Sequence, residues 1–193
     1  MIFISCEEKF TSPELEKSFS SSQISDFKTI VKFFTQQICQ NNEKLEFKNC
    51  YEKILPELVE YGWNPILENV DFEKQKEMYK SISKSTFDEI WRYSKTYGAA
   101  NSISAHKYIG ITMRGEYIKY LKEIGLKNKF LSEYTQGIRE SGGIESYGHL
   151  EAHIFNNPQD LDLNDPNVQI LISIHYLGFP QKVKIENYSV LQI

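Results

Sequence analysis

Two histidines and a carboxylate in strict alternation are the residues of this chain best suited to chemistry. His149, Glu151 and His153 occupy every second position of the stretch 148–155, with aliphatic or small residues between them. On a β-strand, side chains two positions apart lie on the same face, so this spacing predicts a polar face that carries all three groups. Neutral imidazoles and a carboxylate suit Zn²⁺ or Fe²⁺ as ligands, and they also serve as general acids and bases.

A second apolar stretch extends this candidate site. Residues 168–177 predict another strand, on which Ser173 and His175 lie on the face opposite to the isoleucines. If the two strands pair, three of the four histidines share one surface, with about 5 Å between directly opposed positions. A metal-dependent enzyme is therefore one alternative function, and its possible metal ligands are His149, His153, His175 and Glu151.

None of the known catalytic motifs that we compared matches these residues. A zincin helix needs Glu directly after its first His, where Leu150 stands, and the inverted motif needs Glu directly before its second His, where Ala152 stands. The pair His149 and Glu151 has deaminase spacing, but no Cys occurs beyond position 50 to complete that zinc site. The strand face therefore has two further interpretations, a polar surface in solvent and a protein-contact surface. We expect no cofactor, and Zn²⁺ or Fe²⁺ is the alternative expectation.

Acidic residues gather beside this stretch. Asp160, Asp162 and Asp165 are spaced as in a calcium loop, but Asp165 replaces the required turn glycine and Leu171 replaces the bidentate Glu. The segment instead predicts a solvated loop that offers negative charge to a basic partner. The residues expected to contact this partner are Glu145, His149, Glu151, His153, Asp160, Asp162, Asp165 and His175.

The charge of the chain is unevenly distributed. The net charge is −4, which disfavours attraction of the whole molecule to nucleic acid or to an anionic membrane. Residues 84–129 carry a net charge of +5, and their Lys and Arg residues are interleaved with Tyr, as in segments that contact a nucleic-acid backbone. Amphipathic helices with Lys stems packed over Tyr rings explain the same pattern. A nucleic-acid-binding regulator is the second alternative function, although nucleic acid is the less favoured partner.

The rest of the sequence predicts the elements that position these groups. Apolar residues recur at helical spacing over residues 23–40, and Pro56 interrupts a similar pattern, which predicts a kink or a new helix start. Further helices are predicted to start at Ser12 and to cover 71–82, 86–98, 114–124 and 129–140. Beyond residue 141 the period changes from 3.6 to 2, which predicts the strands 148–155, 168–177 and 182–192.

These elements predict one α+β domain over residues 1–193. Its helical part, 1–141, contains a helical layer over about residues 12–140, and its β part, 142–193, is an antiparallel meander of about three strands. The three cysteines, Cys6, Cys39 and Cys50, are widely spaced and odd in number, which predicts reduced thiols. Since no apolar run approaches the roughly 18 residues that span a bilayer and no signal-peptide pattern opens the chain, we expect a cytoplasmic protein.

Elimination leaves a small, acidic α+β protein that binds another protein. We expect a bacterial immunity protein or an antitoxin-like inhibitor, which covers the basic surface of a toxin or nuclease with its acidic sheet end. The abundance of Lys, Asn, Ile and Tyr is compatible with an AT-rich bacterial genome. Enzymatic activity is the less favoured class.

Overall fold

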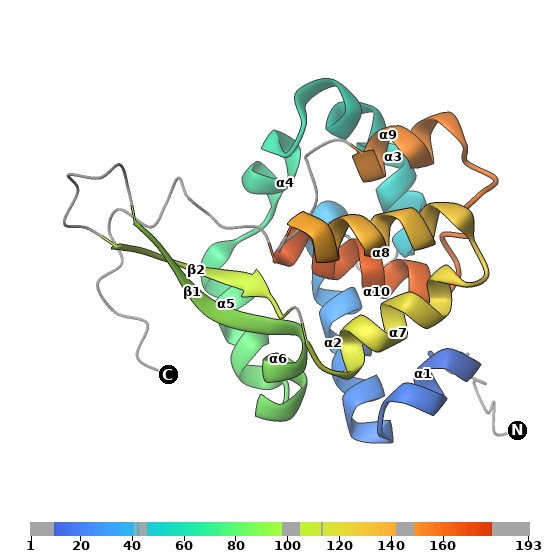
Figure 1. Cartoon of the computed structure of the whole chain (residues 1–193). Coiled ribbons are helices and arrows are strands. Elements are labelled where there is room, and N and C mark those ends of the chain that lie inside the picture. Colours follow the sequence, from blue (N-terminus) through green and yellow to red (C-terminus); the bar gives the residue numbers. More distant parts are fainter. Residues whose placement is uncertain are drawn as a thin grey trace, which may run out of the picture.

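The computed structural model describes residues 10–40, 42, 46–97, 105–112, 114–141 and 149–178, and only the backbone at 93–97, 105–108 and 141. These residues form ten α-helices and a two-stranded antiparallel sheet (Figure 1). The helices are α1 (Pro13–Ser18), α2 (Ser21–Ile38), α3 (Phe47–Tyr61), α4 (Asn64–Asn69), α5 (Phe72–Ser81), α6 (Lys84–Ile90), α7 (Glu116–Gly125), α8 (Lys129–Ser141), α9 (His149–Asn156) and α10 (Pro166–Leu177). The strands are β1 (Trp91–Tyr97) and β2 (Ala105–Ile111).

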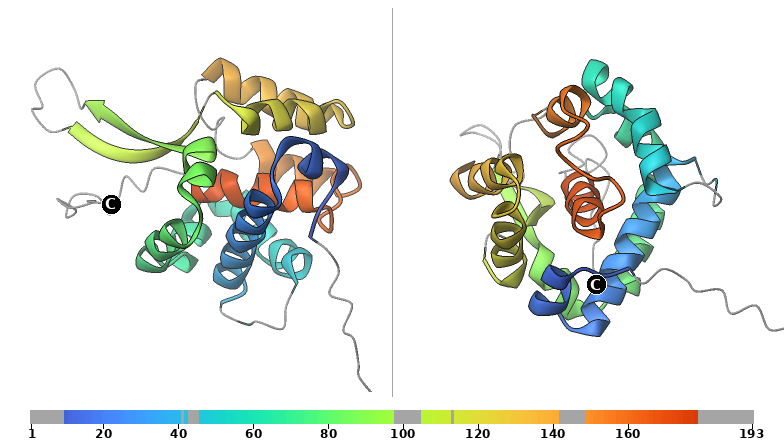
Figure 2. Two further views of the ribbon diagram at one scale, coloured as in Figure 1. Left: turned by 90° about the horizontal axis from the view of Figure 1, so that it is seen from below. Right: turned by 90° about the vertical axis from the view of Figure 1, so that its right-hand side faces the viewer.

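Helix α10 lies in the middle of the helical body, with the other helices arranged around it (Figure 2). Ten of its twelve residues are buried. Asp165 caps the helix by accepting a hydrogen bond from the Asn167 backbone N–H at 2.8 Å, and Pro166 occupies the first turn, where its missing N–H costs nothing. The ring of Tyr176 stacks on Phe34 of α2 with centroids 5.5 Å apart. The core is therefore built around a helix that is apolar in almost every direction.

The prediction of an α+β fold with a C-terminal three-stranded meander is wrong. The stretches 148–155 and 168–177, both predicted as strands, coincide largely with the helices α9 and α10 instead, and 182–192 lies outside the described residues. In α10, apolar residues occur on both faces of the expected strand, since Leu171 and Leu177 share a face with Ser173 and His175, so the period of 2 does not distinguish a buried strand from a buried helix. In α9, Leu150 and Ile154 are four positions apart and both are buried, which satisfies the helical period.

Strand β1 lies in a segment that the sequence predicts to be helical, and β2 lies between two predicted helices. The helix expected over 86–98 ends at Ile90, and β1 follows α6 with no connecting residue. Trp91, Tyr93 and Tyr97 are aromatic and Thr96 is β-branched, and residues of both kinds favour an extended chain. In the antiparallel register Trp91 lies opposite Ile111, and Lys95 lies opposite Lys107.

Several predicted helices are confirmed. The pattern over 23–40 corresponds to α2, which begins with a capping box between Ser20 and Gln23. Asp71 caps α5, because its side chain accepts hydrogen bonds from the backbone N–H groups of Glu73 and Lys74. Pro56 starts no new helix, because α3 continues through it to Tyr61. The cap residue that follows, Gly62, has a φ of 62°, which favours glycine.

The expectation of reduced thiols is wrong for two of the three cysteines. Cys39, at the end of α2, forms a disulfide with Cys50 in α3, and their Cα atoms lie 5.2 Å apart. Cys6 lies outside the described residues. The bridge joins the two ends of the α2–α3 connection. Within the described chain, no helix has both the length and the apolar character needed to cross a membrane.

Candidate functional site

The histidines and carboxylates predicted as one site are divided between the core and the surface. Glu151 is fully buried and His175 is almost fully buried, whereas His149 is exposed at the start of α9. In a helix, residues two apart lie about 200° apart around the axis, so Glu151 lies opposite the two histidines that flank it. The common strand face expected for these residues does not exist. Glu145 lies outside the described residues.

Glu151 belongs to a buried hydrogen-bond network between three helices. The hydroxyl of Tyr176 donates to Glu151 Oε1 at 2.8 Å, and the Tyr51 hydroxyl lies 3.2 Å from that of Tyr176. Burial raises the pKa of both tyrosine hydroxyls far above the usual value, so both remain protonated at physiological pH. Since all three side chains are closed to solvent, the network connects α3, α9 and α10 and offers no surface for a ligand.

His175 forms a separate buried contact. Its Nδ1 lies 2.8 Å from the hydroxyl of Tyr134 in α8, and its ring packs against Trp63 with centroids 5.0 Å apart. Burial lowers the pKa of His175 to about 3, so the imidazole is neutral at physiological pH. This histidine therefore joins α8 to α10 within the core, away from solvent.

Several residues of the predicted partner-binding surface lie in the loop 157–165 or contact it. His153 Nε2 lies 3.0 Å from Asp160 Oδ2, and its ring stacks on Phe130 with centroids 3.7 Å apart. Asp162 is exposed and accepts a hydrogen bond from the Asn164 backbone at 2.9 Å. Asp165 is half-buried as the cap of α10, and burial raises the pKa of its carboxyl. The acidic loop is therefore present, with Asp160 and Asp162 in solvent.

A metal site does not assemble from these residues. Among the described residues, no group of three or more His, Cys, Asp or Glu lies close enough to hold a metal ion. Glu151 bonds to a tyrosine in the core, and His153 bonds to a surface aspartate. The four proposed ligands thus have other partners or, as with His149, lie at the surface of α9.

A different surface combines acidic and apolar side chains. We define the α3–α9 surface as the exposed acidic and large apolar residues of α3, α9 and the loop 157–165, because α3 packs against α9. Its residues are Glu52, Glu57, Val59, Glu60, Tyr61, Phe155, Asp160 and Asp162. Residues 46–70 carry a net charge of −3, and residues 149–178 carry −4 with no Lys or Arg. A basic surface is its electrostatic complement.

Exposed apolar side chains concentrate on this surface. Four large apolar residues are well exposed in the described chain, and three of them are Val59 at 42%, Tyr61 at 56% and Phe155 at 47%. The fourth, Leu126, lies after α7. A hydrogen bond to Glu60, with a smaller effect from the charge of Glu57, raises the pKa of Tyr61, so this aromatic ring lies in a negative field. Exposed aromatic residues with charged neighbours are typical of protein contact sites.

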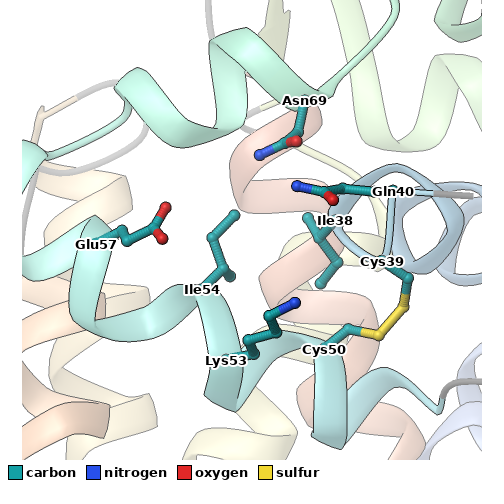
Figure 3. A pocket seen from close by; sticks show the side chains of 8 residues that line it. All are labelled: Ile38, Cys39, Gln40, Cys50, Lys53, Ile54, Glu57 and Asn69. Carbon is teal, nitrogen blue, oxygen red and sulfur yellow. A yellow bond between two sulfur atoms is a disulfide. The ribbon is translucent and has the colours of Figure 1, made fainter. Parts of the chain in front are cut away.

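Two hollows of the described chain are less suited to a ligand. A pocket of about 50 Å³ lies beside the disulfide, and its lining includes Lys53 and Glu57 of α3 and Asn69 of α4 (Figure 3). This volume holds only a few water molecules. A wider hollow of about 500 Å³ lies between α7 and α8, and Lys122, Arg139 and Glu140 line it. Its charges are of both signs, so it selects no particular ligand.

Sequence reasoning overlooked the α3 half of the surface. The signal was present in the helical pattern of 47–61, because Val59 and Tyr61 lie outside the apolar stripe that continues through Leu58. The strand predicted over 148–155 includes Phe155, and the exposure of this residue follows only from the helical conformation of α9. In comparisons with protein-family models, curated proteins and solved structures, no significant match to the chain was found.

Proposed function

We propose that this chain is a protein-binding module whose α3–α9 surface binds a basic protein. The observation that carries this proposal is the concentration of three of the four well-exposed large apolar side chains on two packed helices with acidic surroundings. The partner that fits best is a basic toxin or nuclease, and the chain inhibits it by covering its surface, in the manner of a bacterial immunity protein or antitoxin.

Apolar and acidic residues have separate roles in this proposal. Tyr61 and Phe155 are about half exposed, and transfer of such a side chain into a partner pocket contributes on the order of 1–2 kcal/mol. The carboxylates around them steer a basic protein toward the surface and orient it. Because residues 149–178 contain no Lys or Arg, an approaching cationic surface meets no local like charge from this segment.

The test compares a surface variant with a matched control in the native host. The tagged chain is used to capture its partner, and Tyr61→Ala/Phe155→Ala is compared with Leu126→Ala, which removes an exposed apolar side chain elsewhere. We expect the unmodified chain and the control to form a stoichiometric complex with a basic protein. The double variant is expected to bind that protein at least about 30-fold more weakly, as a loss of about 2 kcal/mol requires.

A growth assay then tests inhibition. Expression of the captured protein alone is expected to arrest growth, and co-expression of the chain is expected to restore it. The double variant should fail to restore growth although it is folded. Equal affinity of the double variant and the control would contradict the surface, and a captured protein that is acidic or harmless would contradict the inhibitor function.

A cytoplasmic location is part of the proposal, because an inhibitor of an intracellular nuclease must meet its target there. The disulfide between Cys39 and Cys50 argues against this location, since disulfides persist mainly in oxidising compartments. Rapid alkylation of thiols in intact cells measures the state of the two cysteines. Reduced cysteines in the cell support the cytoplasm, and a fully oxidised pair contradicts it.

A further inference from the structure

The β1–β2 hairpin extends away from the helices and is anchored at its root (Figures 1 and 2). Trp91 is 1% exposed, and its ring contacts Tyr79 and Phe87 at centroid distances of 4.8 and 5.7 Å. Ile111, opposite Trp91, is also buried, and the Thr112 N–H donates to the Ile90 carbonyl at 2.7 Å. A well-packed base therefore holds a two-stranded ribbon that no described helix covers along its length.

The charge of this hairpin has a single sign. Residues 91–114 contain four Lys or Arg residues and no Asp or Glu, which gives them a net charge of +4. The register places Lys95 directly opposite Lys107, and Arg92, which is exposed, lies opposite Gly110. A polyanion is the electrostatic complement of a ribbon with this charge.

We propose that the β1–β2 hairpin binds duplex DNA, independently of the α3–α9 surface. The major groove of B-form DNA is about 12 Å wide and admits a two-stranded β-ribbon. Each strand has seven residues, so the ribbon is about 23 Å long and is able to cross the groove. Arg92, Lys95 and Lys107 supply the charges that neutralise phosphates and release counterions.

The acidic balance of the whole chain does not oppose this contact. The acidic loop 157–165, which follows α9, lies at the far side of the helical body from the hairpin (Figure 1). Exposed charges farther apart than about 8 Å are largely screened at physiological salt, so the local charge of the hairpin determines its attraction to DNA. The deep, narrow major groove of A-form RNA excludes protein side chains, which favours DNA over double-stranded RNA.

Fluorescence anisotropy with a labelled DNA duplex of about 20 base pairs tests the proposal across about 50–200 mM salt. Three to four phosphate contacts predict that the logarithm of affinity falls with the logarithm of salt concentration with a slope of about −3. In Arg92→Gln/Lys95→Gln/Lys107→Gln, this slope is expected to approach about −1, and affinity at about 100 mM salt is expected to fall at least about 10-fold.

The control has the same change in net charge at exposed lysines outside the hairpin. Lys32→Gln/Lys53→Gln/Lys129→Gln is expected to bind the duplex like the unmodified chain. Circular dichroism checks that both variants keep their helical content. The absence of salt-dependent binding at about 50 mM salt would overturn the proposal, as would equal loss in both variants. Tighter binding of a single strand or of double-stranded RNA, or equal competition by polyglutamate, would also overturn it.

Discussion

Tyr176 of α10 donates a hydrogen bond to Glu151 of α9 at 2.8 Å, and both side chains are buried. The hydroxyl of Tyr51 in α3 lies 3.2 Å from that of Tyr176, so one carboxylate and two phenols join three helices. A residue that the sequence offers as a metal ligand or general base therefore holds the core together. Its removal should change stability before it changes any binding property.

Replacement of Glu151 tests this role. Glu151→Gln keeps an acceptor for the Tyr176 hydroxyl at nearly the same volume, whereas Glu151→Ala removes the acceptor and leaves a void. We expect the Gln variant to be more stable than the Ala variant by about 1–3 kcal/mol, as for other buried hydrogen-bond partners. Urea unfolding monitored by circular dichroism gives both free energies. Equal stability of the two variants would show that the hydrogen bond contributes nothing.

The buried His175 predicts a dependence of stability on pH. Its pKa is lowered to about 3 by burial, while in the unfolded chain it is about 6.5. Between these values the unfolded state binds one proton more than the native state, so this histidine makes stability fall as pH falls. Its effect is about 1.4 kcal/mol per pH unit below pH 6.5.

Two variants isolate that contribution. In His175→Gln, the slope of unfolding free energy against pH between about 4 and 6 is expected to decrease by the equivalent of one proton. His149→Gln, at an exposed position, is expected to leave the slope unchanged. Chemical unfolding at a series of pH values measures both, and an unchanged slope in His175→Gln would contradict a buried neutral imidazole.

A buried carboxylate near the N-terminus of the described chain depends on one lysine. Lys127 donates to Glu14 Oε1, and Asn167 Nδ2 donates to Glu14 Oε2 at 3.1 Å. The hydrogen bond from Lys127 is the main reason that the pKa of Glu14 falls to about 2. This stabilisation is present above pH 4.5, and it is lost as pH falls toward 2.

Removal of this lysine should therefore destabilise the protein at neutral pH. Lys127→Ala is expected to lower stability at pH 7, and this effect should shrink below about pH 4 as the Glu14 carboxylate becomes protonated. Lys129→Ala, which removes an exposed lysine paired with Glu133, is expected to change stability by less than about 0.5 kcal/mol. Thermal unfolding at both pH values compares them, and equal effects of the two substitutions would contradict this assignment.

The Cys39–Cys50 disulfide predicts a redox-dependent stability. The bridged residues are 11 apart in sequence, and closure of such a loop contributes about 3 kcal/mol by restricting the unfolded chain. We expect dithiothreitol to lower the urea midpoint of the unmodified chain to that of Cys39→Ser/Cys50→Ser. The double variant itself should not respond to the reductant. Thiol titration showing three free cysteines in the unreduced, denatured protein would contradict the bridge.

Local sequence determined the helices whose signals are short-range. In α2 the apolar residues recur along one face and a capping box opens the helix, so neighbouring residues suffice to predict it. In α5 the cap at Asp71 has the same effect. The hairpin could not be predicted in this way, since β1 becomes a strand through its pairing with β2 and through the burial of Trp91 against α5 and α6.

The tertiary structure determined where the side chains of the predicted catalytic or metal-binding residues lie. His149, Glu151 and His153 alternate in the sequence, but the backbone conformation determines which way their side chains point. A strand would place all three on one face, whereas a helix separates Glu151 from the histidines. Packing against α3 and α10 makes the helix the stable choice, because it buries Leu150 and Ile154 and gives Glu151 a partner in Tyr176. These contacts join segments far apart in the chain, so no local pattern contained them.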